Sequence, residues 1–166
     1  MHIVEPIIVT PESEFERVVV NAAESILHTN NFMFITIRKF GLDVAFFIGS
    51  KLGTKMKSLE FKCYVGQRPG GIGFGTQNGL GPQVDLLRNS TLELELVEPF
   101  VRWALVDALQ PAGNKRYALL DSIVARAGAM GDIKAGKQNN FRVSAFQPYL
   151  TDWNEFLVSL EQYLNA

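Results

Sequence analysis

The first 65 residues contain one segment with helical periodicity followed by three with strand periodicity, and this order constrains the fold more than any other feature. Thr10 can cap the helix and Pro11 suits its first position. Apolar side chains then recur at helical spacing: Phe15, Val18, Val19, Ala22 and Ile26. Runs rich in Phe, Ile and Val follow at residues 31–39, 42–48 and 58–65. We expect a strand meander covered by the helix.

The remainder of the chain is harder to assign. Residues 66–82 hold seven of the 14 glycines, which indicates a loop. The patterns predict helices opening at residue 83, over 99–109 and 117–127, and after Thr151, and strands over 92–97 and 141–146. Trp103 and Trp153 are expected in the core. Mixed helices and strands without a dividing linker predict a single α/β domain over residues 1–166.

Composition excludes several classes of protein. Apolar residues make up 47% of the chain, which is globular composition, and Cys63 is the only cysteine, so no internal disulfide can form. No uncharged apolar stretch is long enough for a membrane span, and the first residues do not resemble a signal peptide. We therefore expect a cytoplasmic protein with no membrane partner. The segment from Arg38 to Arg68 carries seven basic and two acidic residues, against a net charge of −1 for the whole chain. Such a segment indicates either a surface for polyanions or ordinary solvated lysines.

Three charged residues on two neighbouring apolar strands form the strongest candidate for a site. Asp43 precedes the run VAFFI, where a buried acid needs a partner. Glu60 and Lys62 are two residues apart and therefore share one face of their strand. If the two strands pair, Asp43 can reach that face. Paired carboxylates repel each other unless a cation lies between them, and hard divalent ions prefer oxygen ligands.

These residues resemble the motif of the PD-(D/E)xK nuclease superfamily. Glu60-Phe61-Lys62 matches the E-x-K element, and Asp43 matches the preceding acidic residue. Glu16, on the predicted helix, resembles the metal-site glutamate of members similar to Holliday-junction resolvases. The resemblance covers about residues 10 to 66. Leu42 stands where the family name would place proline, and the glycine-rich loop has no counterpart that we recognise.

The resemblance implies a restriction-endonuclease-like fold, three αβα layers around a mixed central sheet. It implies a Mg²⁺-dependent endonuclease that hydrolyses DNA phosphodiester bonds, with Mn²⁺ as an alternative ion. Asp43, Glu60 and Glu16 would bind the metal, the carbonyl of Phe61 could add a ligand, and Lys62 would position the attacking water. A homodimer is consistent with the two sites that cutting a duplex requires.

Two other functions remain open. The chain could be a non-catalytic member of the same fold that binds nucleic acid or protein. Alternatively, the glycine-rich loop could bind a nucleotide, although its spacing matches neither of the two common phosphate-binding motifs. Cys63 alternates onto the apolar side of its strand, which indicates packing, not a nucleophile.

Overall fold

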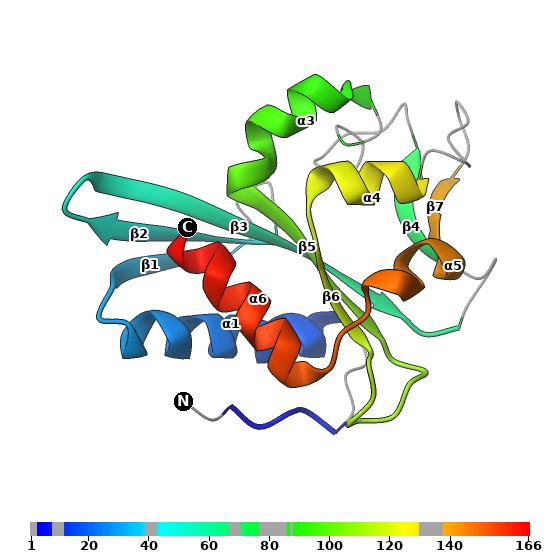
Figure 1. The fold of residues 1–166 in the computed structure, drawn as a ribbon, viewed down its shortest axis with the longest axis horizontal. Coiled ribbons are helices and arrows are strands. Elements are labelled where there is room, and N and C mark those ends of the chain that lie inside the picture. The colour runs from blue at the N-terminus through cyan, green and yellow to red at the C-terminus, as the bar shows by residue number, and fades with distance from the viewer. Residues whose placement is uncertain are drawn as a thin grey trace.

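The computed structural model describes residues 3–7, 12–38, 43–66, 71–76, 86, 88–129 and 138–166. Its main element is a five-stranded mixed sheet in the order β1-β2-β3-β5-β6. The strands are β1 (Met33–Arg38), β2 (Val44–Ser50), β3 (Gly53–Tyr64), β5 (Val101–Asp107) and β6 (Tyr117–Leu120). In Figure 1, α1 (Glu12–Thr29) and α6 (Trp153–Asn165) lie on one side of this sheet, and α3 (Thr91–Val97) and α4 (Ser122–Ala129) lie on the other. The α/β class is therefore confirmed.

β3 is the longest strand and changes its neighbours along its length. From Gly53 to Leu59 it pairs antiparallel with β2, and from Ser58 to Tyr64 it pairs parallel with β5. β1 is antiparallel to β2, so the predicted meander over these strands is confirmed. The pairing with β2 ends where that with β5 begins, so in the part of the chain that is described no strand pairs with the other side of β3 beyond Leu59. We call this side of β3 its open edge. That edge carries the candidate site.

One core lies between the sheet and the helices α1 and α6. Alternation along β3 sends Leu59 and Phe61 into this core, where both are fully buried. The ring of Phe15 on α1 meets Phe61 edge to face, with 5.8 Å between ring centroids. Trp153 on α6 packs against the ring of Tyr117 at 5.0 Å. Aromatic pairs of this kind bury large areas and fix the helices against the sheet.

A second core lies on the other face of the sheet, under α3 and α4. It is closed by a two-stranded sheet of β4 (Gly71–Thr76) and β7 (Gln138–Arg142), followed by α5 (Val143–Phe146). A Cβ atom at Gly128 would lie 1.2 Å from the ring of Phe141, so only glycine fits on α4 at this point. The short helices η1 (Glu98–Phe100) and η3 (Gln147–Tyr149) complete the structure that is described.

Several expected elements are wrong in type. Residues 91–97 form a helix, not a strand, because the Ser90 hydroxyl accepts from the Glu93 N–H and the Glu93 carboxylate accepts from the Ser90 N–H. The apolar run predicted as a helix over 99–109 is instead the buried strand β5. Trp103 is buried as expected; the helical pattern also placed Phe100 inward, but its side chain is 43% exposed. Residues 117–127 and 141–146 each begin as a strand and end as a helix.

Other expectations fall partly outside the described residues. Gly71–Thr76 is a strand, so the predicted loop is interrupted, while residues 67–70 and 77–82 are not described. Thr10 and Pro11 are not described either, although the helix that they were expected to open is present. The helix after Thr151 is confirmed. No helix within the described ranges has the length and hydropathy needed to cross a bilayer.

Candidate functional site

Asp43 and Glu60 lie together where β2 separates from β3. The last residue pair between these strands is Val44 opposite Leu59, so the next residue before β2 comes opposite Glu60. The amide N–H of Phe61 donates a 2.8 Å hydrogen bond to Oδ2 of Asp43. Asp43 therefore reaches the open edge of β3 with its side chain, and the expected approach of Asp43 to Glu60 is present.

Glu12 occupies the next position along the same edge. The N–H of Cys63 donates to Oε2 of Glu12 over 3.3 Å. In a strand, alternate amide groups point to the same side, so the N–H groups of Phe61 and Cys63 are successive donors on this edge. The carboxylates of Asp43 and Glu12 thus accept the two hydrogen bonds that backbone carbonyl groups of a longer β2 would have accepted. The first turn of α1 and the residue before β2 are brought together by this shared strand edge.

Glu60 and Lys62 project from the face of β3 that is opposite to Phe61. They are only 3% and 7% exposed, so they are not the ordinary solvated pair that a strand surface often carries. On the neighbouring strand β5, Trp103 lies beside Glu60 and Leu105 lies beside Lys62. An ionisable pair held among such apolar neighbours must be stabilised by other charges in the cluster.

The protonation of Glu60 reflects this crowding. Burial raises its pKa, and the adjacent Asp43 adds to this effect by charge repulsion and by a hydrogen bond between the two carboxyl groups, so that the pKa of Glu60 is about 8. Lys62 acts in the opposite direction but does not cancel these effects. At neutral pH the Glu60 carboxyl group is therefore largely protonated, as expected for a buried carboxyl group beside another one when no cation separates them.

Lys62 is itself affected by the cluster. Burial lowers the pKa of its ammonium group, whereas Glu12, Glu60 and Asp43 favour the charged form, in that order of effect. Its charge thus lies among three carboxyl groups that come from α1, β3 and the residue before β2. This arrangement brings together Asp43, Glu60 and Lys62 as the sequence predicts.

The helix contributes a glutamate one turn earlier than expected. Glu16 is half-buried and forms an ion pair with Arg38 at 3.4 Å, on the side of β1. Glu12 has Lys62 and Asp43 among the charges that act on it, and burial raises its pKa. Glu12 is not among the candidates that the sequence analysis names. Its spacing of four residues from Glu16 was the available signal, since such residues share one helix face.

The donor set fits a hard cation with few protein ligands. No three Asp, Glu, His or Cys side chains in the described part of the chain form a metal-binding group. Mg²⁺, however, is typically held by one or two carboxylates and keeps several waters. Asp43 and Glu60 supply two carboxylates, and the carbonyl of Phe61 points to the same strand edge as its N–H. The charge of Asp43 acts on Glu12, so Glu12 is the carboxyl group next to this pair.

Most of the described basic residues in the segment from Arg38 to Arg68 have polar partners within the molecule. Lys57 is 4% exposed and its Nζ donates to the carbonyl of Pro99 at 2.8 Å. Lys55 donates to the carbonyl of Ala166 at 3.1 Å, and Arg38 pairs with Glu16. Lys39 and Arg68 are not described. These contacts do not indicate a continuous surface for polyanions, and the buried Lys57 is not an ordinary solvated lysine either.

The strand that carries the site is also held from the far side. The hydroxyl of Tyr163 on α6 accepts from the N–H of Ser58 at 3.0 Å and donates to its carbonyl at 2.8 Å. Ser58 lies two residues before Glu60 on β3. Cys63, two residues beyond Phe61, packs against the core, and burial raises its pKa to about 11. A thiol with this pKa remains protonated at neutral pH, which agrees with a packing role.

Comparison of the chain with models of known protein families, with curated proteins and with solved structures finds no match.

Proposed function

We propose that this chain is a Mg²⁺-dependent endonuclease that hydrolyses DNA phosphodiester bonds. The observation that carries the proposal is the contact between Asp43 and Glu60 at the open edge of β3, with Lys62 next on the same face. The element order α1-β1-β2-β3, followed by a parallel return to β5, also supports a restriction-endonuclease-like fold. The contact and the order of α1, β1, β2 and β3 are what the resemblance in residues 10–66 leads one to expect.

Each residue has a specific task in this proposal. Asp43 and Glu60 hold the cation, with the Phe61 carbonyl beside them and Glu12 in the place that the resemblance gave to Glu16. When bound, Mg²⁺ supplies a positive centre that polarises the phosphodiester and lowers the pKa of the attacking water. The ammonium group of Lys62 orients that water or offsets charge that develops on the phosphate. Mn²⁺ fits the same oxygen donors.

Asp43→Asn tests the cation site. We expect the wild-type protein to cut DNA with Mg²⁺ or Mn²⁺ and to stop on addition of a chelator. The variant should cut at least about 100-fold more slowly, because an amide is a weaker ligand for a hard cation. Cleavage is followed on supercoiled plasmid and on branched duplexes, and Mn²⁺ binding is measured by titration. Glu95→Gln, an exposed carboxyl group on α3, is the matched control and should behave as wild type. Full cleavage by Asp43→Asn would remove the proposed site.

Lys62→Met separates chemistry from cation binding. The variant keeps the length of the side chain but removes its charge, so we expect cleavage to fall at least about 100-fold. Mn²⁺ affinity should be retained or increased, because a positive charge beside the carboxylates has been removed. Titration calorimetry and plasmid cleavage measured on the same preparation give both values. Equal loss of binding and cleavage would show that Lys62 only supports the carboxylates.

A non-catalytic member of the same fold is the second candidate. It is favoured by the hydrogen bonds that Asp43 and Glu12 accept from the β3 backbone. These bonds stabilise the strand edge, so both carboxylates have a role in the fold without binding a cation. In that case the cluster stabilises the edge of β3, and the purified protein cuts no DNA with either ion. Binding of DNA without cleavage, unchanged by Lys62→Met, would support this candidate.

A further inference from the structure

The edge strand β1 carries few of the features that usually keep a sheet edge from pairing. It lies at the end of the sheet and pairs only with β2 in the part of the chain that is described. Its sequence, MFITIR, contains no proline and no lysine, and its six pairs with β2 run without a register shift. Natural edge strands are commonly interrupted by such residues or by bulges. The outer backbone groups of β1 are therefore arranged to accept another strand.

The side chains of β1 differ sharply between its two faces. On the face toward α1, Thr36 donates to Glu24 at 3.2 Å, Arg38 pairs with Glu16, and Phe34 meets the ring of His28. On the other face, Met33 and Ile35 are 82% and 65% exposed. The side chains on one face of β1 thus have partners on α1, whereas the other face presents large apolar side chains to solvent.

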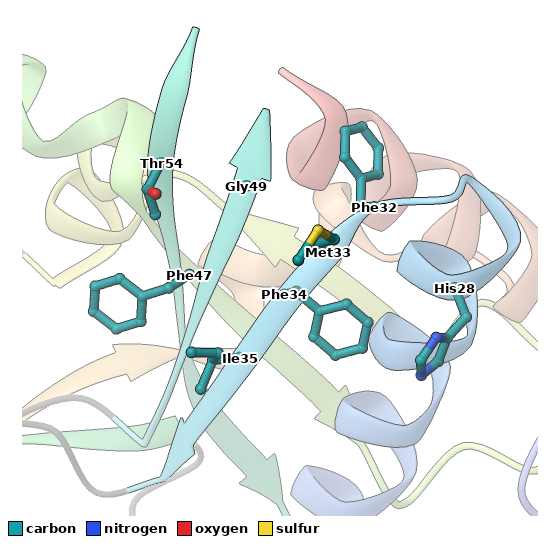
Figure 2. Close-up of a pocket in the computed structure, with 8 residues that line it drawn as sticks. All are labelled: His28, Phe32, Met33, Phe34, Ile35, Phe47, Gly49 and Thr54. Atoms are coloured by element: carbon teal, nitrogen blue, oxygen red, sulfur yellow. The ribbon is translucent and has the colours of Figure 1, made fainter. Parts of the chain in front are cut away.

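An apolar groove of about 440 Å³ runs along this edge. Figure 2 shows Met33 and Ile35 on β1 with Phe47 on the neighbouring strand β2, and His28 on α1. Phe47 is directly opposite Ile35 in the register of the two strands, so these side chains share the exposed face. Contiguous apolar surface on an unprotected edge is typical of an interface with another chain.

We infer that the partner at this edge is a second copy of the same chain, which pairs through β1 about a twofold axis. If two copies of β1 run antiparallel with Ile35 opposite Ile35, Met33 comes opposite Ile37 on both sides of the axis. Every pair on the exposed face is then apolar. On the helix face, Phe34 comes opposite Thr36. The sequence of β1 is therefore complementary to itself in this register.

The position of the charged residue on β1 supports the same antiparallel pairing of two copies. Arg38 is the only charged residue of β1, and it is the last residue of the strand. In the antiparallel register the two Arg38 side chains lie at opposite ends of the new ladder, about 20 Å apart at about 3.4 Å per residue. The pairing closes on itself and leaves no β1 edge free for further addition. It does not use Asp43, Glu60 or Lys62, so it does not depend on the proposed nuclease activity.

The mass of the full-length protein in solution tests this inference. Light scattering after size-exclusion chromatography at several concentrations should give twice the mass of one chain. Ile35→Lys should halve that mass, because it places two ammonium groups opposite each other in the interface, while the circular dichroism spectrum stays unchanged. Val158→Lys, at a residue that is 55% exposed on α6, is the control and should remain dimeric. A monomeric wild type, or a dimer unaffected by Ile35→Lys, would overturn the inference.

A cross-link tests the register even if Ile35→Lys fails to fold. In a Cys63→Ser background, Ile35→Cys places two thiols opposite each other, with Cβ atoms about 5 Å apart. Mild oxidation should convert most of the protein to a covalent dimer on a non-reducing gel. Val158→Cys in the same background should not cross-link. Equal cross-linking of the two variants would exclude β1 as the interface, whether or not the protein cuts DNA.

Discussion

Glu60→Gln is expected to abolish DNA cleavage and at the same time to make the metal-free protein more stable at alkaline pH. The carboxyl group has a pKa of about 8 in the folded protein against 4.5 for an ordinary glutamate. Between these values the folded state keeps a proton that the unfolded state has released. The free energy of unfolding therefore decreases as the pH rises from 4.5 through 8. Glutamine resembles the protonated form and carries no such dependence.

The size of this effect follows from the shift in pKa. One unit corresponds to about 1.4 kcal/mol, so the difference between wild type and variant at pH 9 can reach several kcal/mol. Urea unfolding in the presence of a chelator, at pH 5, 7 and 9, measures it. The two proteins should be similar at pH 5 and should diverge as the pH rises. Glu95→Gln, which removes an exposed carboxyl group, should follow wild type at all three values.

The same variant tests function on the same sample. Loss of one of two carboxylate ligands should reduce cleavage below detection, together with Mn²⁺ binding. Higher stability with lost activity is the expected signature of a site that is held in an unfavourable state for its function. If Glu60→Gln were less stable than wild type at pH 9, the ionised Glu60 carboxylate would not destabilise the folded protein, and the first part of the prediction would be wrong. If it cut DNA normally, Glu60 would not be a ligand.

Glu5→Ala should destabilise the protein by about 3–5 kcal/mol, because it leaves a buried guanidinium group without its counter-charge. Arg116 is 2% exposed, and its Nε lies 3.2 Å from Oε1 of Glu5. The Arg116 guanidinium also donates to the hydroxyl of Tyr117 and to the carbonyls of Gln110 and Pro6. Carbonyl groups alone do not compensate for the removal of a charge from water.

A double-mutant cycle separates the missing charge from lost packing. Arg116→Met replaces the cation by an apolar side chain of similar length, so adding Glu5→Ala to it should cost much less than Glu5→Ala alone. Urea unfolding of the four proteins gives the coupling energy. The exposed pair of Glu14 and Arg17, at 2.6 Å, is the control, and Glu14→Ala should leave the stability nearly unchanged. A coupling energy near zero for Glu5 and Arg116 would contradict the prediction.

The site was largely predictable because it depends on short-range geometry. Alternation places Glu60 and Lys62 on one face of β3 whatever the strand pairs with, and the structure has them there. The register of β2 on β3 was not predictable, because Lys55 and Lys57 made residues 49–57 resemble a connection. In the structure the hairpin turns at Lys51 and Leu52. Lys55 and Lys57 lie on β3, with their ammonium groups over the rings of Phe32 and Tyr163, respectively.

The second half of the chain was less predictable for two different reasons. The sequence Leu92–Val97 alternates leucine with glutamate, and a short run of this kind fits a helix or a strand. The capping box of Ser90 and Glu93 was the deciding signal and was missed. The run that forms β5 is apolar on both faces, because cores lie on both sides of the sheet, and periodicity cannot distinguish such a strand from a buried helix.

The bridge from Tyr163 to Ser58 has a practical consequence for genetic screens. This tyrosine belongs to the last helix and touches the backbone of β3 two residues before Glu60, yet it comes from the opposite side of the sheet. Its replacement would shift the strand and with it the carboxyl cluster. A screen for variants that no longer cleave DNA would therefore find position 163 together with positions 43, 60 and 62. The distance of Tyr163 from the carboxyl cluster would then identify it as a residue that supports β3 and does not contact the substrate.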